Sequence, residues 1–151
     1  VMSYEEVVNL LNHEMFMLRA LALSKLALPN CRPNPPVGCV LVKDDTIVSE
    51  GYTQAPGQHH AEAQAIADYD GDLNNITAYV TLEPCSFVGR TPSCAHTLTG
   101  LNIQRVVVAT IDPDPRNSGK GIAVLTDAGI DVEVGICQRE VSEFISPYLL
   151  K

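Results

Sequence analysis

Residues 76–94 read ITAYVTLEPCSFVGRTPSC, an apolar run that leads directly into a Pro-Cys pair and closes on a second cysteine. The apolar part, Ile76–Leu82, is predicted to be a strand because β-branched and other apolar residues follow one another in it. Pro84 stands where a helix can begin, so we expect Cys85 to lie at a helix N-terminus. Cys94 is expected to continue as a helix after the intervening loop, which places two thiols near one end of this strand.

Strand-like runs alternate with helical segments along the rest of the chain. The predicted strands are Val37–Val42, Ile47–Tyr52, Ile76–Leu82, Arg105–Thr110 and Ile130–Val134. The predicted helices cover about Tyr4–Leu11, His13–Ala27, His60–Tyr69, Cys94–Gly100, Gly119–Ala128 and Cys137–Leu149. This alternation predicts an α/β fold, a three-layer α/β/α sandwich around a mixed five-stranded sheet. Ligands of such sheets gather at the carboxyl ends of the strands.

A second short stretch, His60-Ala61-Glu62, supplies what the two cysteines lack for a metal site. One imidazole and two thiolates, from Cys85 and Cys94, form a ligand set that suits zinc. Three protein ligands leave the fourth tetrahedral position open, which is typical of a catalytic zinc site. A structural zinc site is normally closed by a fourth Cys or His, and no such residue is placed for that role. Glu62 stands two residues after the histidine, close enough to handle the protons of a water molecule.

An H-x-E motif followed by P-C and a further cysteine is the signature of the zinc deaminases. The eight residues between Cys85 and Cys94, with the inner sequence Gly89-Arg90-Thr91-Pro92, resemble the deaminase domain of the RibD family of riboflavin biosynthesis. Further stretches match the same family: Pro33-Asn34-Pro35, Val37-Gly38-Cys39-Val40, Ala78–Glu83 and Asp112-Pro113. The resemblance implies a cytidine-deaminase-like fold. Because it begins at about Glu14, we expect an N-terminal lead-in at 1–12 and a zinc-dependent deaminase domain at 13–151.

The resemblance implies hydrolytic deamination with Zn²⁺ as the cofactor. The family's substrate is the riboflavin-pathway intermediate diaminohydroxyphosphoribosylaminopyrimidine, and ammonia is released. The metal ligands would be His60, Cys85 and Cys94, and Glu62 would be the catalytic group that moves protons between water, ring nitrogen and leaving amine. Two alternatives stay open: a deaminase of another small aminated pyrimidine or purine base or nucleoside, and a non-catalytic zinc-bearing binding module. An intact Glu62 argues against the second.

Six residues are candidates for substrate binding, three carried over by position in the resemblance and three where the chain departs from it. They are Asn34, Arg90, Asp112, Asp114, Thr53 and Phe87. Thr53 and Phe87 stand where the family usually has histidine, and Asp114 replaces the asparagine of the family's D-P-N-P. Two potential contacts to a phosphate or ribose are therefore missing. Asp114 also adds negative charge near the place where a phosphate would lie.

The composition of the chain limits its partners. With 151 residues, 46% of them hydrophobic, the chain is long enough for one domain with its own core. The net charge of −8 and the absence of Lys/Arg runs argue against nucleic acid, which requires clustered basic residues. Five cysteines form no disulfide pattern, so we expect a reducing, cytoplasmic setting. No apolar stretch reaches the roughly 18 residues of a membrane span, so we expect no membrane partner. Sibling deaminases usually associate, and we therefore expect a homo-oligomer, a dimer or tetramer. Its ligand is expected to be a small aminated heterocycle.

Overall fold

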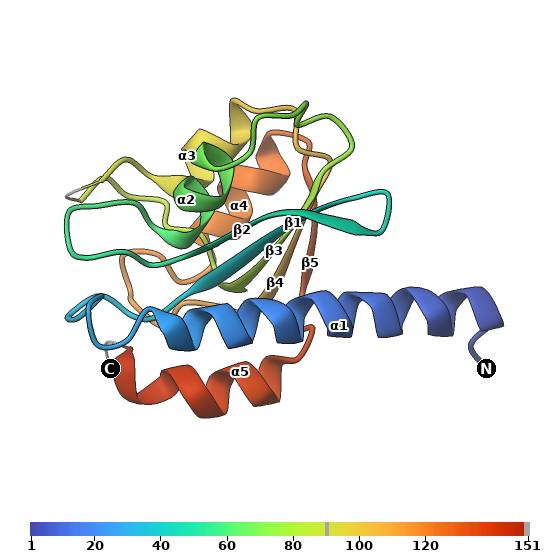
Figure 1. Cartoon of the computed structure of the whole chain (residues 1–151), viewed down its shortest axis with the longest axis horizontal. Helices are drawn as coiled ribbons and strands as arrows, with labels where there is room; N and C mark the ends of the chain where they lie inside the picture. The colour runs from blue at the N-terminus through green and yellow to red at the C-terminus, as the bar shows by residue number, and fades with distance from the viewer. Residues whose placement is uncertain (90, 150–151) are drawn as a thin grey trace.

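The chain forms a five-stranded mixed sheet with helices on both faces, as seen in the computed structural model, which describes residues 1–89 and 91–149 (Figure 1). The strands are β1 (Gly38–Lys43), β2 (Thr46–Tyr52), β3 (Thr77–Leu82), β4 (Arg105–Thr110) and β5 (Asp131–Val134). Their order in the sheet is β2-β1-β3-β4-β5. Strand β1 is antiparallel to β2 and β3, whereas β3, β4 and β5 are parallel. The predicted α/β class and mixed five-stranded sheet are confirmed.

The three central strands are buried on both faces. Strands β1, β3 and β4 consist almost entirely of buried residues, whereas the edge strands β2 and β5 are largely exposed or half-buried. Strands that are covered on both faces read as continuous apolar runs, and this is why the sequence pattern located them well. Asp44 and Asp45, with φ of 50° and 61°, form the tight turn between β1 and β2.

Two helices cover one face of the sheet and three cover the other (Figure 1). The first face carries α1 (Tyr4–Leu26) and α5 (Gln138–Ile145), followed by a short 3₁₀ helix (Ser146–Tyr148); the second carries α2 (Ala61–Ala67), α3 (Cys94–Thr99) and α4 (Lys120–Asp127). A Cβ added at Gly51 of β2 would lie 2.4 Å from the Ala61 carbonyl oxygen, so this glycine lets the start of α2 approach the sheet. No helix among the described residues combines the length and the apolar character needed to span a membrane.

The N-terminal segment differs from the sequence prediction. We predicted separate helices over Tyr4–Leu11 and His13–Ala27, but α1 is continuous from Tyr4 to Leu26, so that break was wrong. Neither Gly nor Pro stands near the expected break, and the backbone hydrogen bonds continue through it. The N-terminal cap follows the prediction, because the Ser3 hydroxyl accepts the Glu6 N–H at 3.1 Å. The division into a lead-in at 1–12 and a deaminase domain from 13 stays a prediction.

The segment around Cys85 also differs from the prediction. No helix begins at Pro84; residues 83–93, other than the undescribed 90, form an irregular loop, and the helix starts at Cys94. Ser93 is the reason, because its hydroxyl accepts the His96 N–H at 3.3 Å and so caps α3. The same hydroxyl donates to the Cys85 carbonyl at 2.8 Å, which ties the loop to the helix start. The thiol at a helix N-terminus is therefore that of Cys94.

The loops that carry the candidate site residues lie along one edge of the sheet, the edge where the carboxyl ends of β2, β3 and β4 meet. Because β3 and β4 are parallel, the loops that follow them, residues 83–93 and 111–119, leave the sheet at the same edge. Strand β2 points in the same direction, since both it and β3 are antiparallel to β1, and it leads toward His60 at the start of α2. The loop before β1, with Asn34, enters the sheet at this edge as well.

Candidate active site

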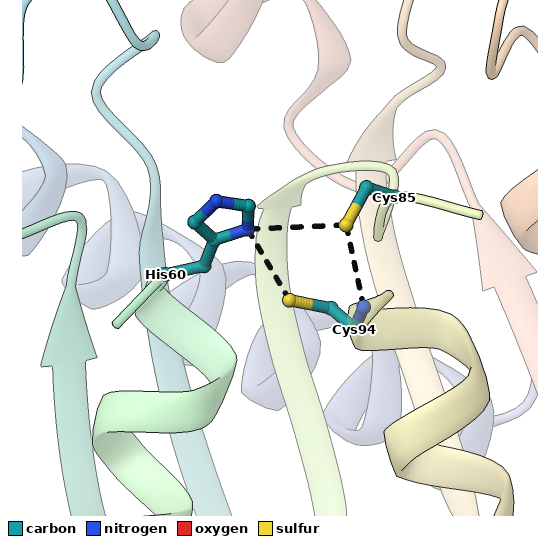
Figure 2. A group of neighbouring side chains, drawn as sticks. All are labelled: His60, Cys85 and Cys94. Atoms are coloured by element: carbon teal, nitrogen blue, oxygen red, sulfur yellow. Dashed lines mark hydrogen bonds between the residues drawn. The ribbon is translucent and has the colours of Figure 1, made fainter. Parts of the chain in front are cut away.

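Three side chains from separate elements converge at this edge (Figure 2). The Nδ1 atom of His60 lies 3.3 Å from the Cys94 sulfur and 3.8 Å from the Cys85 sulfur. His60 directly precedes the first residue of α2, Cys85 belongs to the loop after β3, and Cys94 is the first residue of α3. Their ligand atoms all lie within 4.8 Å of one another. One nitrogen and two sulfur atoms at this spacing fit a small thiophilic cation such as zinc.

The three groups differ in how readily they give up a proton, which each must do to bind a metal. Hydrogen bonding with the Cys94 side chain, helped by His60, lowers the pKa of Cys85 to about 4, so this thiol ionises readily. The same interaction raises the pKa of Cys94, so this thiol has to lose its proton when a metal binds. Hydrogen bonding to Cys85 raises the pKa of His60. On its other ring nitrogen, Nε2, His60 contacts the Thr91 hydroxyl at 3.1 Å, and a partner of this kind fixes the orientation of a ligand imidazole.

Glu62 lies beside the three ligands and is almost completely buried. It is in the first turn of α2, and only 5% of its surface is exposed. Burial raises its pKa to about 7, with a further contribution from the negative charge of Cys85. A carboxyl group in such a place can both accept and donate a proton near neutral pH.

A cavity of about 570 Å³ opens in front of these groups, and His60, Glu62 and Cys85 form part of its wall. Five of the six predicted substrate residues also line it: Asn34, Thr53, Phe87, Asp112 and Asp114. The sixth, Arg90, lies outside the described residues. A cavity of this volume can hold a small heterocycle with a sugar attached.

Comparison with known proteins places the chain in a family. The family described as "Cytidine and deoxycytidylate deaminase zinc-binding region" matches residues 11–110. The chain belongs to this deaminase family. It is 46% identical over 128 residues to riboflavin biosynthesis protein RibD of Aquifex aeolicus, covering 85% of this chain and 36% of that protein. It is 43% identical over 134 residues to the diaminohydroxyphosphoribosylamino-pyrimidine deaminase of Buchnera aphidicola subsp. Acyrthosiphon pisum, covering 89% of this chain and 91% of that protein.

Solved structures give the same relationship. Form 2 of Acinetobacter baumannii RibD superposes with a TM-score of 0.89 at 43% identity, covering 93% of this chain and 40% of that chain. The Rib2 deaminase of Aspergillus oryzae in complex with DARIPP superposes with a TM-score of 0.73 at 25% identity, covering 91% of this chain and 92% of that one. The chain thus spans about a third of the RibD proteins that it matches and nearly all of the Buchnera deaminase. The resemblance to RibD and the cytidine-deaminase-like fold are confirmed.

Two buried residues that the sequence reasoning did not assign to the site join the loops that follow β3 and β4. Glu83, 3% exposed, accepts the backbone N–H groups of Asp112 and Gly119 on Oε1 and that of Ile122 on Oε2, at 3.0–3.2 Å. It thereby fixes the loop after β4 and the start of α4. A carboxylate directly after a buried strand and before Pro-Cys was the sequence signal that could have drawn attention to it.

Asn117 makes the complementary connection from the other loop. Its side chain is fully buried; Oδ1 accepts the Ser86 N–H at 3.1 Å, and Nδ2 donates to the Pro84 carbonyl at 3.2 Å. These two groups flank Cys85, so a side chain from the loop after β4 holds the backbone of a metal-ligand candidate. Nothing in the sequence pointed to this role, because Asn117 lies within a loop rich in Pro and Asp, where asparagine is an ordinary turn residue.

Thr53 and Phe87 both line the cavity, but Thr53 forms hydrogen bonds with the backbone, whereas Phe87 packs against a side chain. The Thr53 hydroxyl accepts the Val37 N–H at 3.0 Å and donates to the Pro35 carbonyl at 3.2 Å, so it holds the loop that bears Asn34. Phe87 packs against a residue that the sequence reasoning missed, Arg116, whose guanidinium carbon lies 4.4 Å from the centre of the ring.

Proposed function

We propose that the protein is a zinc-dependent hydrolytic deaminase that acts on the riboflavin-pathway intermediate diaminohydroxyphosphoribosylaminopyrimidine and releases ammonia. The observation that carries this proposal is the convergence of His60, Cys85 and Cys94 beside a buried Glu62 on one cavity. The substrate is suggested by the Buchnera deaminase, because this chain covers 91% of that protein at 43% identity.

The proposed mechanism assigns a task to each group at the end of the cavity. His60, Cys85 and Cys94 would hold zinc, which when bound supplies a Lewis acid that activates a water molecule. Glu62 accepts a proton from the attacking water and delivers protons to the ring nitrogen and then to the departing amine. A C–N bond of the cyclic amidine is exchanged for a carbonyl, and water and substrate give product and ammonia. Burial of Glu62 excludes bulk water from this proton path.

The wall of the cavity would bind and orient the substrate. The Asn34 side chain offers both donors and an acceptor, which suits the hydrogen-bonding edge of a base. The Asp112 carboxylate already accepts the Asp114 N–H at 3.0 Å and a longer contact of 3.4 Å from Asn117, so its role includes shaping the loop. Its pKa is raised, first of all by burial.

One observation favours a second candidate function, the deamination of a neutral base or nucleoside. Asp112 lines the cavity, and a carboxylate disfavours an anionic substrate nearby. A panel of aminated pyrimidines and purines, with and without phosphate, separates the two functions when ammonia release is measured. The leading proposal expects the highest kcat/KM for the phosphorylated riboflavin intermediate. A clear preference for the dephosphorylated form of this intermediate would overturn the leading proposal and favour the second function.

We further propose that the protein works as a homo-oligomer in the cytoplasm. The outer face of α1 supports association, because Tyr4, Leu11, Met15 and Leu18 lie on it with 46–86% of their surface exposed. All five cysteines are free thiols, which suits a reducing compartment. Light scattering on the zinc-loaded protein measures the assembly directly, and a monomer at micromolar concentration would contradict the first part of this proposal.

A further inference from the structure

Negative side chains outnumber positive ones among the described residues around the cavity. Among the described residues of its wall, four carry carboxylates and one carries a guanidinium. The carboxylates belong to Glu62, Glu83, Asp112 and Asp114, and the guanidinium to Arg116. The whole chain carries a net charge of −8, so distant charges do not favour an anion either. Any anionic part of a ligand that enters this cavity therefore has one described side chain of opposite charge to approach.

Arg116 is fixed along one edge by Asp114. Its Nε donates to both carboxylate oxygens at 3.2 and 3.1 Å, and its Nη2 donates to Oδ2 at 2.6 Å. The Asp114 side chain is only 8% exposed, and the pKa of this carboxyl is lowered by its hydrogen bond to Arg116. The sequence suggested that Asp114 would repel a phosphate, but the structure gives its charge a partner.

Phe87 supports the flat face of the same guanidinium. The guanidinium carbon lies 4.4 Å from the centre of the Phe87 ring, although the two residues come from different loops. Stacking of this kind is attractive and favours one orientation of the arginine. Together, Phe87 and Asp114 hold Arg116 on two sides while 63% of its side chain stays exposed.

The remaining donors of Arg116 are available to a ligand. Within the described part of the chain, Nη1 makes no hydrogen bond, and Arg116 lines the cavity. A guanidinium whose one edge is bound to a carboxylate can present its other edge to a phosphate. An ordinary surface ion pair between neighbours in a loop would not need an aromatic support from a second loop or a place in the cavity wall.

We propose that Arg116 is a specificity-determining residue of this site and binds the phosphate of the substrate, with Asp114 and Phe87 as the residues that position it. This inference rests on the proposed function, since it names the group that recognises the anionic end of that substrate. Two of the three departures from the RibD pattern, Phe87 and Asp114, then form one arrangement around Arg116.

Steady-state kinetics of the zinc-loaded protein test the assignment. Arg116→Ala should raise KM for the phosphorylated intermediate about 10- to 100-fold more than KM for its dephosphorylated form, because a hydrogen bond to a charged group is lost. Arg116→Lys keeps the charge without the planar fork and should restore part of the difference. The matched control is Arg139→Ala, since Arg139 is also exposed and paired, with Glu143 at 3.4 Å, but does not line the cavity. Equal zinc content and equal melting temperature in the parent protein and the Arg116 variants would exclude a collapsed loop as the cause.

A binding measurement separates this inference from the proposed function. Titration with ribose 5-phosphate, followed by calorimetry or NMR, should show binding to the parent protein and a loss of at least about tenfold in affinity in Arg116→Ala. If the parent protein deaminates the intermediate but Arg116→Ala changes both KM values equally, the inference is wrong and the proposed function stands. If the parent protein binds ribose 5-phosphate through Arg116 but deaminates neither compound, the proposed function is wrong and the assignment of Arg116 stands. No binding and no turnover would overturn both.

Discussion

Replacing Glu83 with glutamine removes the charge that joins the two loops without changing the shape of the side chain. The carboxylate accepts three backbone N–H groups, two on Oε1 and one on Oε2, and is 3% exposed. An amide keeps one oxygen in this place and turns an N–H donor toward at least one backbone N–H. A hydrogen bond to a charged group contributes about 1.5–3 kcal/mol, and a buried donor without a partner costs a similar amount. We therefore expect Glu83→Gln to lower the free energy of unfolding by about 2–4 kcal/mol.

Urea denaturation of the zinc-loaded protein, followed by circular dichroism, measures this change. The melting temperature should fall by roughly 5–15 °C for a chain of this size. Glu143→Gln is the matched control, because Glu143 is exposed and its pair with Arg139 lies on the surface of α5. Such a pair is worth only about 0.3–0.5 kcal/mol. If Glu83→Gln changes the unfolding free energy no more than this control does, the loops are held by other contacts and the reasoning is refuted.

Three further predictions concern the metal, the proton path and the packing behind the loop. Cys94→Ser should lower zinc content from about one per chain and abolish turnover with it; full zinc occupancy by elemental analysis would rule out Cys94 as a ligand. Glu62→Gln should keep the fold and the zinc but lower kcat about 10²–10⁴-fold. Ammonia release at the parental rate would show that another group transfers the protons. Gly121→Ala should cost about 1–3 kcal/mol in a thermal melt, because the added Cβ would lie 1.9 Å from the Pro84 carbonyl oxygen. Gly100→Ala is its control, with a nearest contact of 3.6 Å, and equal melting temperatures for the two would contradict the packing argument.

The sequence predicted the parts of the molecule that depend on local pattern. The bounds of β4, Arg105–Thr110, follow from an apolar run that is buried on both faces. His60, Cys85 and Cys94 were grouped because donor type and order along the chain restrict the choices strongly, and the structure brings their ligand atoms together. The roles of these residues in binding zinc stay predictions until the metal is measured.

The parts that the sequence did not predict depend on contacts between distant segments. The helical start expected at Cys85 moved to Cys94 because Ser93 is the stronger cap, and local propensity alone did not separate the two. Asn117 and Arg116 look like ordinary polar loop residues until the loop after β4 is placed against the loop after β3. A single sequence shows which residues can perform chemistry, but not which residues of a second loop support them.

The bracing of Cys85 by Asn117 has a consequence for the order of events during folding. A chain that grows from its N-terminus contains all three candidate ligands once residue 94 is made, but Asn117 and the Ile122 N–H that holds Glu83 follow later. A nascent chain that ends before the loop after β4 therefore has the donors without the contacts that hold Cys85 in place. We expect tight metal capture to begin only when α4 has docked, so that acquisition of the metal marks the completion of the fold and not the synthesis of its ligands.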